Sequence, residues 1–460
     1  MNSFHKYSIY HDNTLQQKMT TYDVIIVGSG IAGLYAALAV KKHNPRLSIL
    51  VLEKHKKQWV GGRANNEPFY GSNIATGAGI GRKRDRLLKS LMHEHGFPIH
   101  EFKVTPSFSR DIDPVDVKGI LSDLRDVYQK YRGPLTTFEN FAKPVLGDST
   151  YKQFLLSSGY TDYEKAGAEE TLYDYGMEDN ACCLTGFGVD WHNLIRAMAS
   201  KIGEKNFRFS QNVTKITKSL SPPSPSPSPS SSPSPSPSPS PSSPSPSPSP
   251  SSPLYLLETE YGKSIYRCRK VIVATTITGL RELFPTLPIY REIEGQPFLR
   301  IYGKFTKQSI PTLKEYVGKH IATTGHLQKM IAINQETGVY MIVYNDNRHA
   351  LALKSRTENT EANRDYYCDL IERTLGIPEN KRIHLIAIRS FYWKIGTHYY
   401  KPLNAAKYKS RDEFIDEAQH PDSDGDILVV GEVVSKHQGW VEGALESVSR
   451  CLTKKWINNV

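Results

Sequence analysis

The chain has few cysteines and no long apolar segment. Only five of its 460 residues are cysteine, an odd number, and no two of them form a Cys-x-x-Cys pair. This scatter argues against a disulfide framework, offers no metal-ligand spacing and favours a reducing compartment. No apolar run approaches the roughly 20 residues of a membrane-spanning helix, and the first twenty residues lack a secretory core. We therefore expect a soluble cytoplasmic protein with a disordered lead (1–20), no metal and no membrane partner.

The charge balance is basic, with 58 Lys and Arg residues against 47 Asp and Glu, a formal net charge of +11. Such a balance favours anionic partners, such as a nucleotide cofactor, or simply forms a solvated surface. The densest basic cluster, residues 82–86, is interrupted by Asp85 and followed by a helical leucine pattern. A helix start explains this cluster better than a nucleic-acid site does, so we expect no nucleic-acid partner.

Residues 221–253 are all serine or proline. Such a composition cannot bury a core and lacks most backbone donors, which predicts a disordered, extended insertion. The segments on either side read as neighbouring strands, so the insertion lies at a hairpin tip, where added length costs little. It is either a tolerated repeat expansion or a recognition or phosphorylation segment.

A glycine-rich turn near the N-terminus carries the most specific motif. Gly28, Gly30 and Gly33 form a Gly-x-Gly-x-x-Gly pattern between a buried strand at 23–27 and an alanine-rich helix at 31–41, and a second strand at 48–52 ends at Glu53. The glycines permit a tight turn, close approach of a pyrophosphate and close helix packing, and the acid suits ribose hydroxyls. The pattern predicts a dinucleotide site.

A second glycine pair, Gly61-Gly62, precedes Arg63, eight to ten residues after Glu53. The glycines allow the backbone to approach a phosphate or a flavin ring, and arginine offers a fork of donors to a pyrophosphate. A Gly-Gly-Arg shortly after a dinucleotide fingerprint favours FAD over NAD.

Further stretches match a known pattern. They are the glycine-rich segment 77–81, the glycine turn 185–188, Asn212-Val213, the apolar strand 271–275, and the C-terminal segments 430–432 and 439–444. In this order they resemble the flavin-containing amine oxidases, which include monoamine and polyamine oxidases. The resemblance covers both ends of the chain, about half of it, whereas 104–179 and 298–381 match poorly.

The resemblance implies an α/β plus α+β fold, in which a Rossmann-like FAD-binding domain (21–103, 180–290 and 385–460) is interleaved with a mixed-sheet and helical substrate domain (104–179 and 291–384). It implies that the FAD is held by Gly28, Gly30, Ile31, Ala32, Gly33, Glu53, Gly62, Arg63, Gly79, Ile80, Val213, Gly431, Glu432 and Val441. The activity it implies is hydride transfer from a small amine to flavin, imine hydrolysis, and reoxidation by molecular oxygen with release of hydrogen peroxide. A monomer and a homodimer both stay open.

The sequence departs from the family pattern in the substrate region. A lysine that many polyamine oxidases place near the flavin aligns with Arg300, unless the register is shifted and Lys304 takes its place. Of the two aromatic residues that flank the flavin in the family, Trp440 matches one, and Tyr400 or Tyr399 is expected to supply the other. No cysteine lies in this segment, which predicts noncovalent FAD, although the neighbouring His398 is a remote candidate for attachment.

These departures leave alternatives open. One is an amino-acid oxidase or a desaturase of the same fold, and the basic charge mildly favours an anionic substrate. The other is a catalytically weak scaffold that binds FAD without turnover.

Overall fold

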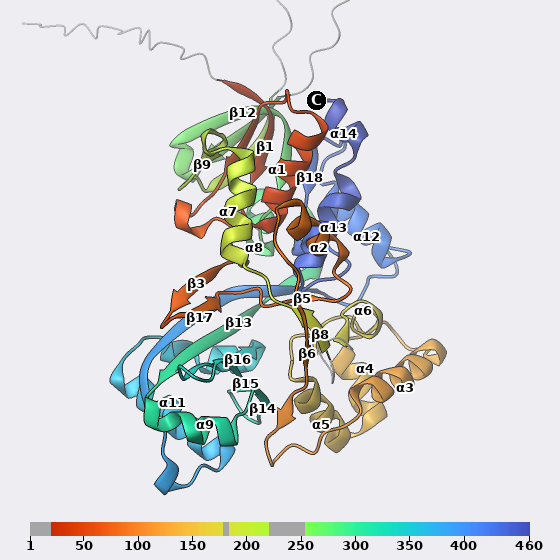
Figure 1. Ribbon diagram of the computed structural model, residues 1–460. Coiled ribbons are helices and arrows are strands. Elements are labelled where there is room, and N and C mark those ends of the chain that lie inside the picture. The colour runs from red at the N-terminus through yellow and green to blue at the C-terminus, as the bar shows by residue number, and fades with distance from the viewer. Residues whose placement is uncertain (1–19, 178–183, 220–253) are drawn as a thin grey trace, which may run out of the picture.

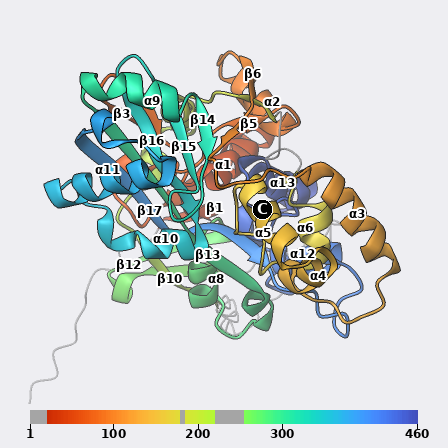
Figure 2. The same ribbon diagram turned by 90° about the horizontal axis from the view of Figure 1, so that it is seen from below.

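The computed structural model describes residues 20–177, 184–219 and 254–460 and has three regions. A layered α/β region contains both the N-terminal strand and the C-terminal helices (Figure 1). A sheet flanked by helices and a group of four helices lie side by side beneath it, as both side and bottom views show (Figures 1 and 2). The Ser-Pro insertion, Cys182, Cys183 and nearly all of the lead lie outside the described residues.

The α/β region is built on a seven-stranded sheet in which β1 is central. Its order is β10-β11-β12-β1-β2-β9, with β18 also paired to β12. The strands are β1 (Thr21–Val27), β2 (Ile49–Leu52), β9 (Phe207–Arg208), β10 (Val213–Ser219), β11 (Leu254–Thr259), β12 (Ser264–Val273) and β18 (Ile427–Val429). β1 runs parallel to β2 and β12, as the β-α-β pattern predicts.

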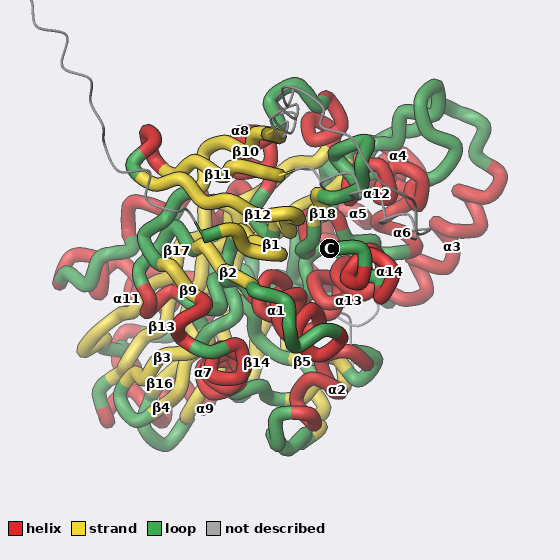
Figure 3. Tube along the Cα trace, turned by 90° about the horizontal axis from the view of Figure 1, so that it is seen from above, coloured by secondary structure: helices red, strands yellow, loops and turns green. Residues whose placement is uncertain are grey.

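The alternation of side chains in β1 divides the apolar core into two layers. Val24 and Ile26 pack toward the helices on one face, whereas Ile25 and Val27 pack toward the other. The first face is covered by α1 (Ile31–His43), α7 (Trp191–Ile202), α13 (Val441–Cys451) and α14 (Lys454–Asn458), and the second by α8 (Ile277–Leu283) and α12 (Arg411–Gln419). Figure 3 shows α1, α13 and α14 together beside this sheet. The chain after Trp440 forms two helices, because α13 ends at Cys451 and Thr453 caps α14.

The second sheet has six strands in the order β17-β13-β16-β15-β14-β7. They are β7 (Ser107–Phe108), β13 (Ile293–Phe305), β14 (His320–Ala322), β15 (Lys329–Asn334), β16 (Val339–Asp346) and β17 (Leu385–Tyr400). Helices α9 (Ile310–Tyr316), α10 (Asn347–Ala352) and α11 (Glu361–Leu375) accompany it. β17 pairs with β13 along nearly its whole length. Residues 385–400, which the resemblance assigns to the FAD-binding domain, thus form a strand of the second sheet.

Four helices form the third region: α3 (Val117–Lys130), α4 (Phe138–Leu146), α5 (Asp148–Ser158) and α6 (Ala168–Tyr173). They share an aromatic core that includes Phe138, Phe154 and Tyr163. A buried bond joins this region to the second sheet, because Thr161 donates its hydroxyl to Asp346 at 2.6 Å. The helical expectation for this part of the chain is confirmed.

Short strands and one helix connect the three regions. They are β3 (Asn66–Phe69), β4 (Ser72–Ala75), β5 (Gly81–Arg82), β6 (Glu101–Val104), β8 (Leu184–Phe187) and α2 (Arg86–Glu94). The expected fold class is confirmed, with a Rossmann-like layer interleaved with a sheet and a helical group. Within the described ranges, no helix combines the length and apolarity needed to cross a bilayer.

Candidate functional site

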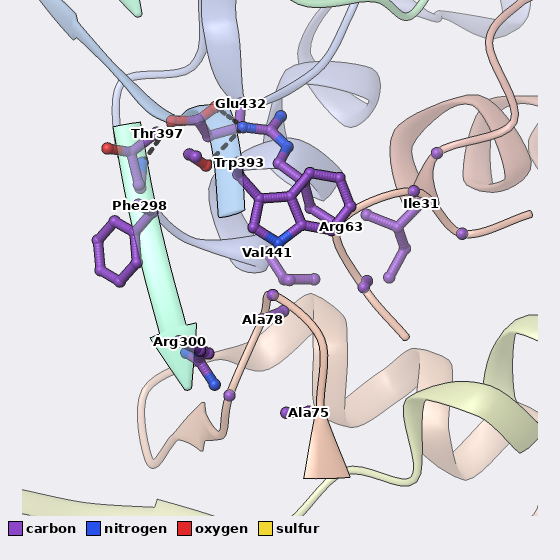
Figure 4. A pocket seen from close by; sticks show the side chains of 18 of the residues that line it. Ile31, Arg63, Ala75, Ala78, Phe298, Arg300, Trp393, Thr397, Glu432 and Val441 are labelled. Carbon is purple, nitrogen blue, oxygen red and sulfur yellow. Dashed lines mark hydrogen bonds and ion pairs between the residues drawn. The ribbon is translucent and has the colours of Figure 1, made fainter. Parts of the chain in front are cut away.

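A cavity of about 1720 Å³ extends from the glycine turn after β1 to the second sheet. Protein pockets of roughly 300–1,000 Å³ already enclose drug-sized ligands, so this one has room for a dinucleotide together with a substrate. Figure 4 shows side chains from α1 (Ile31), from the second sheet (Phe298, Arg300, Trp393 and Thr397) and from α13 (Val441) around it. The described residues contain no cluster of three or more side chains suited to a metal ion.

The three glycines of the turn have different surroundings. A Cβ on Gly28 would lie 2.4 Å from the Ala274 carbonyl oxygen, and Gly28 has φ +105°. A Cβ on Gly33 would lie 2.1 Å from the Gly28 oxygen, whereas one on Gly30 would meet no atom within 4 Å. Packing therefore requires Gly28 and Gly33 to be glycine, while only the cavity lies in front of Gly30. This is the space that a pyrophosphate would need at the N-terminus of α1.

Glu53 lies where the second strand of the motif predicts it, buried at the edge of the cavity. Its Oε2 accepts hydrogen bonds from Ser29 N at 2.8 Å and Ser29 Oγ at 2.7 Å, and its Oε1 accepts one from His55 N at 2.8 Å. These bonds fix the carboxylate between the glycine turn and the start of the next loop. Each carboxylate oxygen has further lone pairs with which to accept from ribose hydroxyls.

Arg63 lies deeper in the cavity and contacts a buried acid. Its Nη1 donates to the Gly396 carbonyl at 2.7 Å and to Glu432 at 3.2 Å (Figure 4). The sequence predicts a contact from Arg63 to the pyrophosphate, whereas here its guanidinium joins the loop after β2 to β17 and to Glu432. Because both residues line the cavity, they still form one wall of the cofactor site.

Glu432 has several donors around its carboxylate. They are His398 N at 2.9 Å, His398 Nδ1 at 2.5 Å and Gly439 N at 2.7 Å. Burial raises the pKa of Glu432, but His398 and Arg63 outweigh that effect and lower it to about 2. His398 has both ring nitrogens in hydrogen bonds, since Nε2 accepts from Ile277 N at 3.2 Å, and burial lowers its pKa.

The N-terminus of α13 also faces the cavity. Trp440 is the residue that precedes the helix, and Gly439, Trp440 and Val441 all line the cavity. The guanidinium carbon of Arg82 lies 3.9 Å from the centre of the Trp440 ring. The first turn of α13 has free N–H groups and a partial positive charge to offer an electron-rich ring or an anion.

The wall opposite is formed by alternate residues of β13. Phe298, Arg300 and Tyr302 face the cavity, whereas Leu299 and Ile301 lie in the core of the second sheet. Lys304, the other candidate for the family lysine, is outside the cavity and its ammonium binds the Thr337 carbonyl. Of the two sequence candidates, the structure brings only Arg300 into the cavity.

Neither tyrosine expected to flank the flavin lines this cavity. Tyr400 is 1% exposed and donates its hydroxyl to Ser435 O at 2.9 Å, and Tyr399 borders a separate small pocket. Trp393 of the same strand faces the cavity instead, with Nε1 donating to Thr76 O at 2.7 Å (Figure 4).

An irregularity in the strand pairing follows directly after Trp393. Phe298 pairs with Trp393 and Gln296 with Thr397, so residues 394–396 of β17 lie opposite Pro297 alone. Proline has no N–H for the ladder and is typical of such bulges. Pro297 is thus a sequence signal for a bulge. The sequence alone does not show which residues of β17 form that bulge, because this depends on how the two strands pair.

A cluster of buried charges occupies the end of the cavity at the second sheet, and sequence reasoning missed it. Lys329 at the start of β15 reaches the cavity with its ammonium 3.0 Å from the centre of the Tyr160 ring. Burial lowers the pKa of Lys329 to about 7, although Asp346 and Asp162 oppose this. Burial and Asp346 raise the pKa of Asp162 to about 7, and the Tyr175 hydroxyl donates to it at 2.5 Å.

Most residues predicted to hold the cofactor are thus brought together in one cavity. Those that line it are Gly28, Gly30, Ile31, Ala32, Glu53, Gly62, Arg63, Gly79, Ile80, Val213, Gly431, Glu432 and Val441. Gly33 lies behind the turn, where it packs against Gly28. The roles of these residues toward FAD stay predictions.

Solved structures of amine oxidases have this fold. Cyclohexylamine oxidase from Brevibacterium oxydans IH-35A matches with a TM-score of 0.66 at 14% identity over 96% of this chain and 99% of its own. Wild-type putrescine oxidase bound to putrescine matches with a TM-score of 0.65 at 14% identity, over 96% of this chain and 100% of its own. A double mutant of putrescine oxidase from a redesign of cofactor binding matches with a TM-score of 0.65 at 14% identity over 96% and 99%.

Sequence comparison adds a match to one part of the chain. The family model described as an NAD(P)-binding Rossmann-like domain matches residues 26–94, which contain the glycine turn and Glu53. No curated protein matches the chain in sequence at a significant level. The fold is therefore that of putrescine oxidase and cyclohexylamine oxidase, with a Rossmann-like segment at the dinucleotide motif.

Proposed function

We propose that this protein is an FAD-dependent oxidase of small amines. The observation that carries the proposal is the continuity of the cavity, which joins the dinucleotide turn at Gly30 to the buried cluster around Lys329 and Asp162. The fold shared with two solved amine oxidases supports the same conclusion. When FAD is bound, the amine gives a hydride to it, water hydrolyses the imine product, and oxygen takes up the electrons as hydrogen peroxide.

Different residues of the chain bind the cofactor, exclude water and orient the substrate. The turn at Gly28–Gly33 and Glu53 hold the dinucleotide, and Arg63, Glu432 and the start of α13 form the wall nearest to its reactive end. Trp393, Phe298, Tyr344 and Met341 exclude water and orient the substrate. An aromatic, desolvated wall also favours the neutral amine, which alone has the lone pair needed for hydride release.

The buried cluster supplies a proton acceptor for the substrate ammonium. The pKa of Asp162 and that of Lys329 both lie at about 7, so deprotonated forms are available near neutral pH. Asp162 also approaches the cavity wall, since Thr397 Oγ1 lies 3.4 Å from its Oδ2. We assign the transfer of this proton to Asp162, with Lys329 setting its pKa.

This cluster also weighs against an FAD-binding scaffold without turnover. Burying Lys329, Asp162 and Asp346 costs free energy, and a purely structural core of apolar residues would avoid that cost. Buried groups with shifted pKa values that line a cavity are typical of functional sites. Because none of the three forms a direct ion pair with another among the described residues, fold stability alone does not explain them.

An anaerobic titration tests the proposal. The purified protein, supplied with FAD, is mixed without oxygen with monoamines, diamines, polyamines and amino acids while the visible absorbance of oxidised flavin is followed. Bleaching by one class, with hydrogen peroxide formed on readmission of air, is the expected result. A protein that takes up no FAD, or whose flavin none of these compounds bleaches, contradicts the proposal.

A further inference from the structure

Arg300 has an unusual position for a charged residue. It is 5% exposed and lies on a strand whose neighbouring residues Leu299 and Ile301 are fully buried, yet its side chain points into the cavity. Figure 4 shows it projecting from β13 toward the segment that carries Ala75 and Ala78. An arginine keeps its charge even when buried, so this cavity contains a permanent cation.

The groups around Arg300 are aromatic rather than acidic. Its guanidinium carbon lies 4.4 Å from the centre of the Tyr344 ring. Besides burial, the groups that act on its charge are the hydroxyls of Tyr344, Tyr302 and Tyr160, and Tyr302 also shares a side-chain hydrogen bond with it. In the described part of the chain it takes part in no ion pair, and its buried Nε has no hydrogen-bond partner. A buried donor without a partner costs about 1–3 kcal/mol, a cost that an apolar residue at this position would avoid.

The nearby carboxylates are not partners of Arg300. Asp162 and Asp346 act on Lys329, and neither is among the groups that act most strongly on the charge of Arg300. Asp346 is held by Thr161, whose N and Oγ1 donate to it at 3.0 Å and 2.6 Å. Both aspartates are therefore engaged elsewhere, and the guanidinium fork is left facing the cavity.

We propose that Arg300 binds the carboxylate of the substrate, and that the substrate is an α-amino acid. A carboxylate is the group that the planar guanidinium fork binds best, through two parallel hydrogen bonds. A Cβ built on Gly79 would lie 3.2 Å from Arg300 Nη2, so the fork is next to a glycine loop assigned to the cofactor. The acid group must therefore lie close to the carbon that is oxidised.

The remaining walls indicate the side chain of this substrate. Phe298, Ile331, Ile333 and Met341 line the same part of the cavity and are apolar. The reaction is balanced by reactants of the proposed oxidase, since an α-amino acid, water and oxygen give a 2-oxo acid, ammonia and hydrogen peroxide. This inference rests on the proposed function and narrows its substrate class to amino acids with apolar side chains.

The inference is tested with pairs of compounds, an amino acid and the amine that lacks only its carboxylate. They are leucine, in both enantiomers, against 3-methylbutylamine, and phenylalanine against 2-phenylethylamine, each added anaerobically to the FAD-loaded protein. An amino acid is expected to reduce the flavin with at least about a 100-fold larger kcat/KM than its amine, because a site built around a buried hydrogen-bonding group strongly rejects analogues that lack the partner. Reduction by the amines alone overturns the inference but leaves the proposed function intact. Reduction by neither overturns the inference, and the proposed function falls with it only if diamines and polyamines also leave the flavin oxidised.

Variants of Arg300 then separate its role from a merely structural one. Arg300→Gln is expected to raise KM for the amino acid at least about 100-fold, and Arg300→Lys, which keeps the charge without the fork, to restore part of the loss. Calorimetry with 4-methylpentanoate, which has no amine to oxidise, gives a second readout: binding to the wild type and none to Arg300→Gln. Lys304→Gln, on the same strand but outside the cavity, is the control. Equal losses toward the amine and the amino acid, or undiminished carboxylate binding, would refute the assignment.

Discussion

Substitution of alanine at two glycines of the turn separates cofactor binding from folding. Gly30 and Gly33 belong to one motif, yet the space around them differs. A Cβ at Gly30 meets no protein atom within 4 Å, and its φ of −65° suits any residue. A Cβ at Gly33 would lie 2.1 Å from the Gly28 oxygen, so the helix has to move away from the turn. We therefore expect Gly30→Ala to weaken FAD binding and Gly33→Ala to destabilise the apoprotein.

The size of both effects, on the Kd for FAD and on the free energy of unfolding, can be estimated from the cost of overpacking. An extra methyl group forced into a filled space costs roughly 1–3 kcal/mol, which at Gly30 corresponds to a roughly 5- to 150-fold higher Kd for FAD. The same cost at Gly33 appears in the free energy of unfolding without FAD. Urea unfolding of the apoproteins and fluorescence titration with FAD give the two quantities for each variant. If Gly30→Ala binds FAD as tightly as the wild type, the pyrophosphate does not approach this residue and the dinucleotide does not bind at this turn.

Three further predictions concern the cavity walls and their charges. Trp393→Ala is expected to lower kcat/KM at least about tenfold through loss of a cavity wall, whereas Tyr399→Phe leaves it unchanged; equal effects in steady-state assays would contradict this placement. The depressed pKa of Glu432, about 2, contributes roughly 3 kcal/mol of stability that is present above pH 4.5 and lost as the pH falls through about 2. The difference in unfolding free energy between the wild type and Glu432→Gln should therefore shrink between pH 5 and 3 in urea titrations, and a constant difference would argue against the charge. If Asp162 accepts the substrate proton, kcat rises with pH through about 7; since Lys329 lowers the pKa of Asp162, Lys329→Met should move this rise to higher pH, and a rise that stays in place would exclude the coupling.

The dinucleotide half of the site was predictable because its information is local. Gly28, Gly30 and Gly33 are adjacent in sequence, and Glu53 is fixed by the length of a single β-α-β unit. Such a motif fixes its own geometry wherever the unit folds. The C-terminal part of the site was predictable for the same reason. Glu432 and the start of α13 are close to each other in sequence, and both line the cavity.

The aromatic residue of β17 was not predictable in the same way. In a regular strand, alternate residues face the same side, so Tyr399 would share a face with Trp393. The bulge opposite Pro297 adds two residues to β17 and so keeps this alternation, but Tyr399 lies beyond it, opposite Glu294 and beside a separate pocket. Tyr400, on the other face of the strand, contacts Ser435 and Phe414. Which residue faces the cavity thus depends on the partner strand, about 100 residues earlier in the chain (Phe298 pairs with Trp393).

The cluster of buried charges was the part of the site that the sequence predicted least. Arg300, Lys329 and Asp346 come from three strands of the second sheet, and Asp162 comes from the loop between two helices of another region. Each residue on its own reads as an ordinary surface charge, and only the packing of the helical region on the sheet buries them together. Since lone buried charges destabilise a fold, their collection at one end of a cavity implies a role in binding or catalysis. Of the four, only Arg300 has the planar guanidinium that binds a carboxylate through two parallel hydrogen bonds, which is why the substrate is inferred from this residue and not from the acidic pair.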